Sequence, residues 1–258
     1  MSSILLQIKD SVAFITLNRP EKFNSFNREM ALLLQKVLDD CADDKSVRAV
    51  YLTGTGKAFC AGQDLSELAG ENPPGFEVIL SEHYNPIVTR IRTLQKPVVC
   101  AVNGVAAGAG ANIALCCDVV VATASSSFIQ AFSKIGLIPD SGGTFTLPRL
   151  VGFQKASALM LLGDKVSATE AERIGMIYKV FADEIFSEES LKIVITLSTM
   201  PTKGLAYTKM ALNASLNNSL ENQLKKEDEL QYKAAHTADY NEGVTAFIEK
   251  RTPVFKGE

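Results

Sequence analysis

"KPVVCAVNGVAAGAGANIALCCDVVVA", residues 96–122, is the stretch that decides the fold. Its β-branched segment PVVCAV (97–102) predicts a buried strand, and a similar composition returns in VVVAT (119–123). Between them, GAGANIALCCD (108–118) predicts a helix made mainly of small residues. Because a strand, a helix and a second strand form the repeating unit of α/β proteins, this stretch predicts an α/β fold.

The same alternation extends toward the N-terminus. ILLQIKD (4–10) and VAFITLN (12–18) predict two strands joined by a tight turn, and VRAVYLTG (47–54) predicts a buried strand. Asn27 is the expected N-cap of a helix, because an apolar stripe at helical spacing follows it. A second amphipathic helix is predicted over residues 76–94.

The character of the sequence changes near position 150, after which the signals are nearly all helical. Ser167 and Glu170 have the spacing of a capping box at a helix start. A long, highly charged helix is predicted over residues 219–236. We therefore expect an α/β core over residues 1–195 and a helical C-terminal region over residues 196–258.

The size and composition suit a globular protein. The chain has 258 residues, of which 47% are hydrophobic and 21% charged. A chain of this length buries roughly three quarters of its unfolded surface, so it needs neither disulfides nor a metal to fold. The net charge is -3 and no basic block occurs, which argues against a nucleic-acid partner.

The cysteines and histidines point away from disulfides and metals. There are five cysteines, an odd number, and no Cys-x-x-Cys pair, which favours a reducing, cytoplasmic location. His83 and His236 lie far apart in the sequence, so we expect no histidine-rich metal site. The N-terminal stretch MSSILLQIKD lacks the apolar core of a signal peptide, and no apolar run is long enough to span a bilayer.

Three stretches rich in glycine and small residues are candidate site loops: GTGKAFCAGQDL (54–65), NGVAAGAGAN (103–112) and GLIPDSGGT (136–144). The second runs from a strand into a helix, whose first N–H groups can face a developing negative charge. It lacks the Lys-Ser/Thr of a phosphate-binding loop and the glycine spacing of a dinucleotide fingerprint. On this stretch alone, close helix packing is an equally good explanation for the small residues.

These stretches, together with TLNRPEKFNSFN (16–27), resemble the crotonase (enoyl-CoA hydratase/isomerase) superfamily over almost the whole chain. Within it, the pattern GxIPDSGG resembles the phenylacetate-pathway 1,2-epoxyphenylacetyl-CoA isomerases. The resemblance implies a spiral of ββα units whose C-terminal helices build homotrimers, often paired into hexamers. It also implies an acyl-CoA substrate, with coenzyme A as part of that substrate and no separate cofactor.

The resemblance also implies roles for particular residues. The backbone N–H groups of Gln63 and Ala109 would hold the thioester oxygen as it becomes an enolate, and preorganised donors of this kind are worth roughly 3 kcal/mol each. The carbonyl of Ala61 would read the CoA adenine. Further substrate contacts are implied at Asp64, Leu65, Gly108 and Phe132. For Asp64, a helix cap is the favoured alternative.

Basic residues are candidates for the CoA phosphates. The resemblance places Lys22, Lys57, Lys250 and Arg251 where family members meet them, partly from a neighbouring subunit. For any one of these side chains, a solvated surface charge is the competing explanation. Cys60, beside the first glycine-rich loop, is better explained as a small buried hydrophobe than as a reactive thiol.

Asp140 is the expected acid/base. The two glutamates of the family's hydratases correspond to Asn112 and Phe132 here, and neither residue can act as a base. A proton shift from C2 to C4 needs only one base, and Asp140 stands where family isomerases carry an acid. We expect an apolar wall, with Phe132 and Ile138 as candidate members, to raise the pKa of Asp140 by desolvation. The alternative is that Asp140 only forms a turn before two glycines.

The expected function is therefore an acyl-CoA isomerase. The preferred reaction is 1,2-epoxyphenylacetyl-CoA to oxepin-CoA, with the shift of 3-enoyl-CoA to 2-enoyl-CoA as a related activity. A general enoyl-CoA hydratase is the second hypothesis, and a non-catalytic crotonase-fold binding protein is the third. A dehalogenase that uses His83 as base is disfavoured, and an exposed His83 is expected instead.

Overall fold

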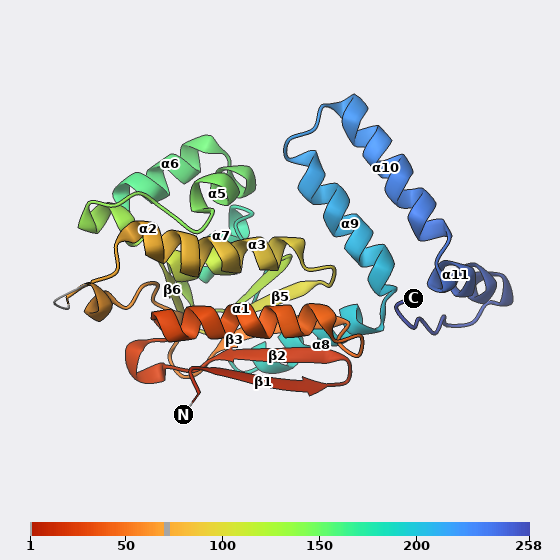
Figure 1. Cartoon of the computed structure of the whole chain (residues 1–258), viewed down its shortest axis with the longest axis horizontal. Helices are drawn as coiled ribbons and strands as arrows, with labels where there is room; N and C mark the ends of the chain where they lie inside the picture. The colour runs from red at the N-terminus through yellow and green to blue at the C-terminus, as the bar shows by residue number, and fades with distance from the viewer. Residues whose placement is uncertain (1, 70–72) are drawn as a thin grey trace.

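The computed structural model describes residues 2–69 and 73–258. It contains two β-sheets flanked by helices (Figure 1). The strands are β1 Ile4–Lys9, β2 Val12–Leu17, β3 Ala49–Gly54, β4 Ala58–Cys60, β5 Val98–Val102, β6 Val105–Ala107, β7 Val119–Thr123, β8 Ser127–Ile129, β9 Lys165–Ser167 and β10 Lys179–Phe181. The α-helices are α1 Arg28–Asp43, α2 Phe76–Val78, α3 Asn85–Thr93, α4 Ala109–Leu115, α5 Gly143–Val151, α6 Phe153–Leu162, α7 Ala168–Arg173, α8 Phe186–Thr199, α9 Thr202–Ser215, α10 Leu220–Ala235 and α11 Ala238–Glu249.

The sheets are linked by a repeated ββα unit. The larger sheet has the order β1-β2-β3-β5-β7-β10 and the smaller one β4-β6-β8-β9. The chain passes from β3 to β4, from β5 to β6 and from β7 to β8, so each of these pairs contributes one strand to each sheet. Neighbours are parallel except β1 with β2 and β8 with β9. The predicted α/β spiral of ββα units is confirmed.

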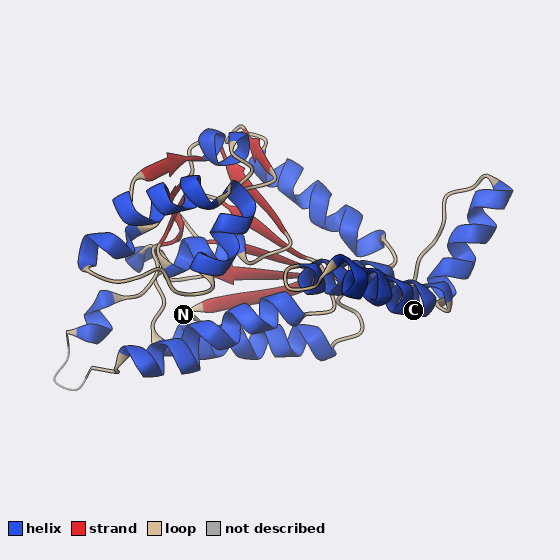
Figure 2. Cartoon of the chain, turned by 90° about the horizontal axis from the view of Figure 1, so that it is seen from above, coloured by secondary structure: helices blue, strands red, loops and turns tan. Residues whose placement is uncertain are grey.

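The central strands of the larger sheet are buried on both faces, whereas its edge strand β1 is mostly exposed. Val50 and Leu52 point into the main core with α1, whereas Ala49 and Tyr51 point into a second core that contains Val194 of α8. This alternation follows from the two-residue period of a strand. Figure 2 shows the sheet between its covering helices. Sequences buried on both faces read as continuous apolar runs, which explains the composition of the stretch from 96 to 122.

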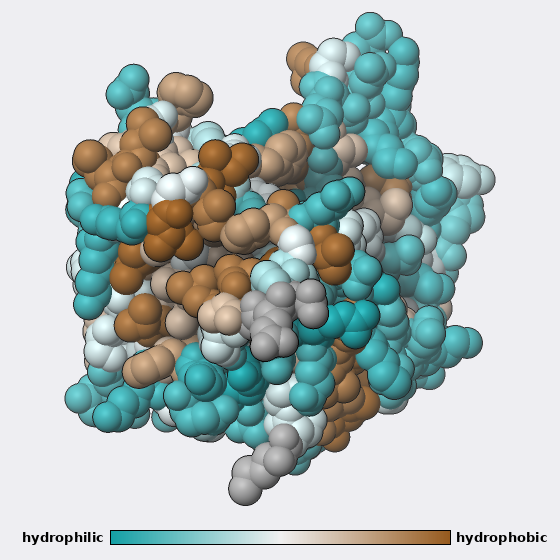
Figure 3. Space-filling model, turned by 60° about the vertical axis from the view of Figure 1, so that its left-hand side comes forward, coloured by the Kyte–Doolittle hydropathy of each residue, from teal (hydrophilic) through white to brown (hydrophobic). Residues whose placement is uncertain are grey.

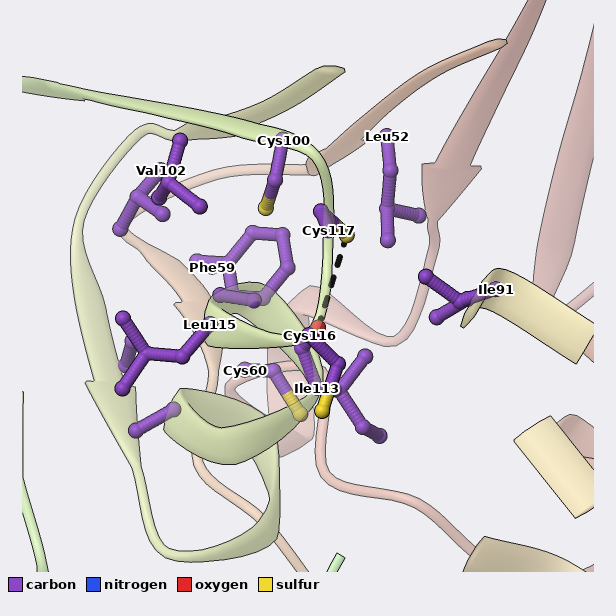
Figure 4. Packing of buried hydrophobic residues seen from close by; sticks show 14 of the residues in the cluster. Leu52, Phe59, Cys60, Ile91, Cys100, Val102, Ile113, Leu115, Cys116 and Cys117 are labelled. Carbon is purple, nitrogen blue, oxygen red and sulfur yellow. Dashed lines mark hydrogen bonds between the residues drawn. The ribbon is translucent and has the colours of Figure 1, made fainter. Parts of the chain in front are cut away.

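The main core also contains the cysteines nearest the site. Figure 4 shows Cys60, Cys100, Cys116 and Cys117 among labelled aliphatic and aromatic side chains such as Phe59. All five cysteines of the chain are buried and unbridged.

Several expected elements are confirmed in detail. The strands β1 and β2 pair through a two-residue turn at Asp10 and Ser11, both at positive φ (51° and 61°), which suits the twist of a hairpin. The Asn27 side chain accepts a hydrogen bond of 3.0 Å from the N–H of Met30, as an N-cap does. The charged helix is α10, which Ser219 caps through the N–H of Asn222.

Other expectations need correction. The region after position 150 is not purely helical, because β9 extends the smaller sheet and β10 the larger one. These strands have three residues each, too short for a periodic pattern to reveal. The capping box is half formed: Ser167 accepts from the N–H of Glu170, but the Glu170 carboxylate binds Arg173 at 2.6 and 2.8 Å instead of reaching back.

The helix expected over residues 76–94 is interrupted by a wide turn. Residues Ile79–Tyr84 form a π-helix between α2 and α3. Pro86 lies in the first turn of α3 and has no N–H to donate. The carbonyl of Glu82 accepts a hydrogen bond of 2.6 Å from the side chain of Gln35 on α1. A side chain from a neighbouring helix thus satisfies a carbonyl in the wide turn.

The C-terminal helices leave the sheets. Helix α8 packs on the larger sheet, whereas α9, α10 and α11 extend away from it (Figure 1). The predicted division between residues 195 and 196 falls inside α8, and it stays a prediction. Among the described residues, no helix combines the length and the apolar composition that a membrane crossing requires.

Candidate active site

Two glycine-rich loops meet at the start of α4. A Cβ placed on Gly62 would lie 3.0 Å from the carbonyl oxygen of Ala107 and 3.4 Å from the nitrogen of Ala109. A Cβ on Gly110 would lie only 2.5 Å from the carbonyl oxygen of Cys60. A real Cβ does not occur at the Gly110 distance, and Gly62 has a φ of 92°, which side chains rarely adopt, so glycine at both positions allows the two backbones to touch. The predicted site loops at 54–65 and 103–112 are therefore packed against each other.

The two expected oxyanion donors lie at this junction, and the described residues offer neither of them an acceptor. The N–H of Phe26 donates to the carbonyl of Gly62 (2.7 Å), and the N–H of Asp64 donates to the carbonyl of Phe26 (2.8 Å). In a trans peptide the N–H of Gln63 points opposite to the carbonyl of Gly62, hence away from Phe26. Ala109 opens α4, where backbone N–H groups lack helical partners. Within the described part of the chain, neither N–H has a hydrogen-bond acceptor.

Asp140 lies in a turn that leads into α5. Ser141 (φ 51°) and Gly142 (φ 73°) both adopt left-handed backbone conformations, which turn the chain sharply after Asp140. The hydroxyl of Ser141 donates to the Asp140 carboxylate at 2.8 Å. Burial raises the pKa of Asp140 above its usual value, although the hydrogen bond from Ser141 opposes the shift. A half-buried carboxyl of raised pKa is suited to take up and release a proton.

Asn112 connects Asp140 to the oxyanion helix. Its side chain is fully buried, donates 2.8 Å to the backbone carbonyl of Asp140 and accepts 2.8 Å from the amide of Gln130. A Cβ on Gly143 would lie 2.3 Å from the same Asn112 amide, so that residue too must be glycine. Asn112 is on α4, the helix that begins at Ala109. The Asn112 side chain therefore links Asp140, the expected base, to the helix that begins at Ala109, one of the two expected oxyanion donors.

The expected apolar wall is only partly present. The Phe132 side chain is 6% exposed, and its ring lies 3.8 Å from a Cβ placed on Gly108, next to Ala109. Ile138 is 81% exposed in the single chain, so its expected place in the wall is wrong. It lies in the loop that follows the 3₁₀ turn at residues 131–135 and projects outward, while Phe132 points inward.

Tyr84 is a site residue that the sequence alone did not reveal. Its hydroxyl donates 2.8 Å to the side-chain oxygen of Gln63. Burial, together with the neighbouring acidic groups of Cys60, Asp140 and Glu67, raises the pKa of Tyr84 well above its usual value. Tyr84 is thus a buried, neutral hydroxyl close enough to Asp140 for the two groups to influence each other's ionisation. Pro86, two positions later inside a helical pattern, was the available signal that this segment is irregular.

Asp64 is confirmed as a cap. Its carboxylate accepts from the N–H and the hydroxyl of Ser66 (3.1 and 2.6 Å), at the start of the 3₁₀ turn Leu65–Leu68, and pairs with Arg19 at 2.8 Å. Burial would raise the pKa of Asp64, but the hydrogen bonds from Ser66 and Arg19 outweigh it and lower the pKa. Both carboxylate oxygens have protein partners, so we propose no substrate contact for this side chain.

The remaining residues of the first loop differ in exposure. Ala61 is exposed, and the Leu65 side chain is 55% exposed, so both are accessible to a substrate. Cys60 is fully buried, and burial raises the pKa of its thiol to about 12, which agrees with the small buried hydrophobe expected there.

The expectation of an exposed His83 is wrong. Its side chain is 1% exposed, because it lies on the inner side of the π-helix with Ile79 and Tyr84. Burial lowers the pKa of His83, so the ring is neutral near pH 7. Its Nε2 atom has no hydrogen-bond partner among the residues that the structure describes.

The basic candidates do not converge in one chain. Lys22 and Lys57 are exposed near the first loop, whereas Lys250 and Arg251 follow α11, on the opposite side of the molecule from α5 (Figure 1). Arg251 is already paired with Glu242 at 2.6 Å. Roles for the last two would require a neighbouring subunit. Over residues 2–69 and 73–258, no cluster of His, Cys, Asp and Glu could hold a metal ion.

Comparisons with known proteins find relatives over the whole chain. The enoyl-CoA hydratase/isomerase family profile matches residues 7–258. The chain is 46% identical to the 1,2-epoxyphenylacetyl-CoA isomerase of Escherichia coli (strain K12), over 100% of both proteins. It is 43% identical to a probable enoyl-CoA hydratase of Rhodobacter capsulatus, over 99% of this chain and 98% of the relative. The solved enoyl-CoA hydratase of Bacillus anthracis matches with a TM-score of 0.95 and 33% identity, over 99% of this chain and 100% of its own.

Proposed function

This chain belongs to the enoyl-CoA hydratase/isomerase family, and we propose that it is an isomerase rather than a hydratase. The substrate class is acyl-CoA thioesters. The preferred reaction is 1,2-epoxyphenylacetyl-CoA to oxepin-CoA, which the 46% identity to the Escherichia coli isomerase supports. A shift of 3-enoyl-CoA to 2-enoyl-CoA is the related activity.

One observation carries the proposal: Asp140 is the half-buried carboxyl group tied to the framework that begins at Ala109, while Asn112 and Phe132 occupy the positions expected for hydratase acids. The Asn112 side chain is already hydrogen-bonded to the backbone carbonyl of Asp140 and to the Gln130 amide. Hydration needs a positioned water and a proton donor. A double-bond shift needs one base that can return the proton it removes.

The proposed double-bond shift has two steps. The Asp140 carboxylate removes the C2 proton, and the electron pair of the C–H bond moves into the thioester, so that an enolate forms. The N–H groups of Gln63 and Ala109 stabilise the enolate oxygen. The protonated Asp140 then delivers the proton to C4, and the double bond comes to lie between C2 and C3. No cofactor takes part in these steps, and coenzyme A enters as part of the substrate.

A panel of acyl-CoAs tests the proposal. It contains 3-enoyl-CoAs, crotonyl-CoA and 1,2-epoxyphenylacetyl-CoA, with products followed by mass and ultraviolet spectrum. We expect products of unchanged mass from the first and third substrates. The second candidate, a hydratase, is favoured by the 43% identity to the Rhodobacter capsulatus protein. Water addition to crotonyl-CoA at a rate of about 10 per second or more would establish that candidate instead.

A non-catalytic crotonase-fold binding protein is the third candidate, and the sequence also left it open. Binding of an acyl-CoA without any turnover across the panel would favour it. The N–H groups of Gln63 and Ala109 support catalysis instead, because they have no acceptor among the described residues and could stabilise the negative charge that develops in a reaction.

Assembly and location are also proposals. Figure 3 shows apolar side chains gathered on the face that carries α5 and α6, and α11 exposes Phe247 (85%) and Ile248 (73%). Apolar surface of this kind is typical of protein interfaces. We propose a homotrimer or hexamer built through the helical tail. The free thiols of all five cysteines support a cytoplasmic location.

A further inference from the structure

The side chain of Gln63 is held from two sides, although only its backbone has a proposed role. Its oxygen accepts from the Tyr84 hydroxyl (2.8 Å), and its nitrogen donates to the Glu67 carboxylate (2.9 Å). The other oxygen of Glu67 accepts from the N–H of Arg28, at the start of α1, at 2.9 Å. The loop with the oxyanion donor is therefore anchored to α1 on one side and to the π-helix on the other.

Tyr84 also packs against Phe26, the residue whose backbone binds the Gly62–Gln63 peptide. Its ring packs edge-on against the ring of Phe26, with centroids 6.0 Å apart and planes at 75°. The N–H of Phe26 binds the carbonyl of Gly62, and this bond orients the planar Gly62–Gln63 peptide. Tyr84 thus contacts the Gln63 side chain through its hydroxyl and Phe26 through its ring. The residue is 1% exposed, so neither contact competes with water.

The π-helix explains how Tyr84 reaches this place. The N–H of Asn85 donates to the carbonyl of Leu80, five residues earlier, which widens the turn that ends at Tyr84. The widened turn buries His83 and Tyr84 together, and Gln35 satisfies the carbonyls of Glu82 and His83 at 2.6 and 3.3 Å. Such π segments frequently occur at functional sites.

We infer that Tyr84 is a positioning residue that holds the N–H of Gln63 on the substrate's thioester oxygen. This inference rests on the proposed function, because that function gives the N–H its role. Loss of the hydroxyl removes one of the two bonds that hold the Gln63 side chain, while the Glu67 bond and the ring contact with Phe26 remain. A small displacement of a preorganised donor lowers kcat by about 10- to 100-fold. KM changes little, because the donor acts mainly on charge that develops during the reaction.

The test uses Tyr84→Phe and, independently, Gln63→Ala, which keeps the N–H but removes the anchored side chain. Cinnamoyl-CoA is the probe, because hydrogen bonding to its thioester oxygen polarises the conjugated system and shifts its absorption to longer wavelength. We expect the wild-type protein to show the shift, and both variants to show a smaller one with probe Kd within about threefold of wild type. The double variant should lose no more than the larger single loss, since both changes break one anchor.

Tyr51→Phe is the matched control. It removes another buried tyrosine hydroxyl, which bonds Ser190 at 2.8 Å in the second core, and should behave as wild type. A wild-type shift and kcat retained in both Tyr84→Phe and Gln63→Ala would overturn the inference. A bound probe without any shift in the wild-type protein would instead show that the proposed oxyanion site is wrong, and the inference would fall with it.

Discussion

Asp140 is placed where ionisation is unfavourable for the fold. It is half-buried, and burial raises its pKa, whereas one hydroxyl, from Ser141, donates to its carboxylate. A raised pKa brings a carboxyl group closer to the range in which proton return is efficient. Stability is lost at such a position in exchange for reactivity, a trade-off that proteins often show at active sites.

This trade-off predicts the effect of Asp140→Asn on stability. Because the pKa of Asp140 is higher in the folded chain than the reference value of 3.8, the folded state binds the proton more tightly. The contribution of Asp140 to stability is therefore fully present below the unfolded pKa and is lost as pH rises through the folded pKa. The asparagine variant should melt at a higher Tm than wild type at pH 7, and the difference should shrink toward pH 3.8. A variant that melts lower at pH 7, in thermal scans across pH, would contradict this.

Asn112 shows what sequence reasoning can and cannot give for a single residue. The resemblance placed it at the position of a hydratase acid, and its amide indeed lacks a titratable group. Its actual contacts join it to the carbonyl of Asp140, 28 residues away in the sequence, and to the amide of Gln130, 18 residues away. No local pattern encodes such a contact. The hydrogen bond between Tyr84 and Gln63 escaped prediction for the same reason.

At the scale of elements, periodic segments were predictable and irregular ones were not. The hairpin β1–β2, helix α1 with its Asn27 cap and helix α10 follow from local propensity and capping. The short strands β9 and β10 form because a sheet edge is available to pair with, which is a tertiary effect. The π-helix likewise depends on Gln35 of another helix to satisfy its carbonyls.

Pro86 makes the π-helix testable as an element. Pro86→Ala restores a backbone N–H and permits a regular helix through residues 76–93. We expect the turn to tighten and Tyr84 to move off Gln63, so kcat should fall by about 10-fold while Tm does not fall. Pro148→Ala, inside α5, is the matched control, because it too replaces a helical proline. Equal kcat in the two variants, measured on one acyl-CoA, would disconnect the π-helix from the site.

At the scale of the whole molecule, the ββα spiral places both glycine-rich loops and the Asp140 turn around the N-terminus of α4. The resemblance across the chain was enough to predict this architecture. It did not predict which apolar surfaces are exposed to solvent in a single chain. Those surfaces are Ile138 with the α5–α6 face, and the outer sides of α10 and α11.

The exposed apolar side chains predict self-association through the tail. Phe247→Glu should lower the native mass, measured by light scattering or sedimentation, because it puts a charge in a surface that we expect to be buried between subunits. Thr245→Glu is the control, since it adds the same charge to the same helix without removing an apolar side chain. An unchanged assembly in Phe247→Glu would place the interface elsewhere.

The most direct test of the account is the activity of Asp140→Asn with its substrate binding measured in parallel. The change keeps the size of the side chain and removes the base, while Asn112 still holds the backbone carbonyl in place. We predict that the variant binds the acyl-CoA with a Kd within about threefold of wild type and isomerises it at least about 1,000-fold more slowly. Isomerisation at the wild-type rate would contradict the assignment of Asp140 as the acid/base.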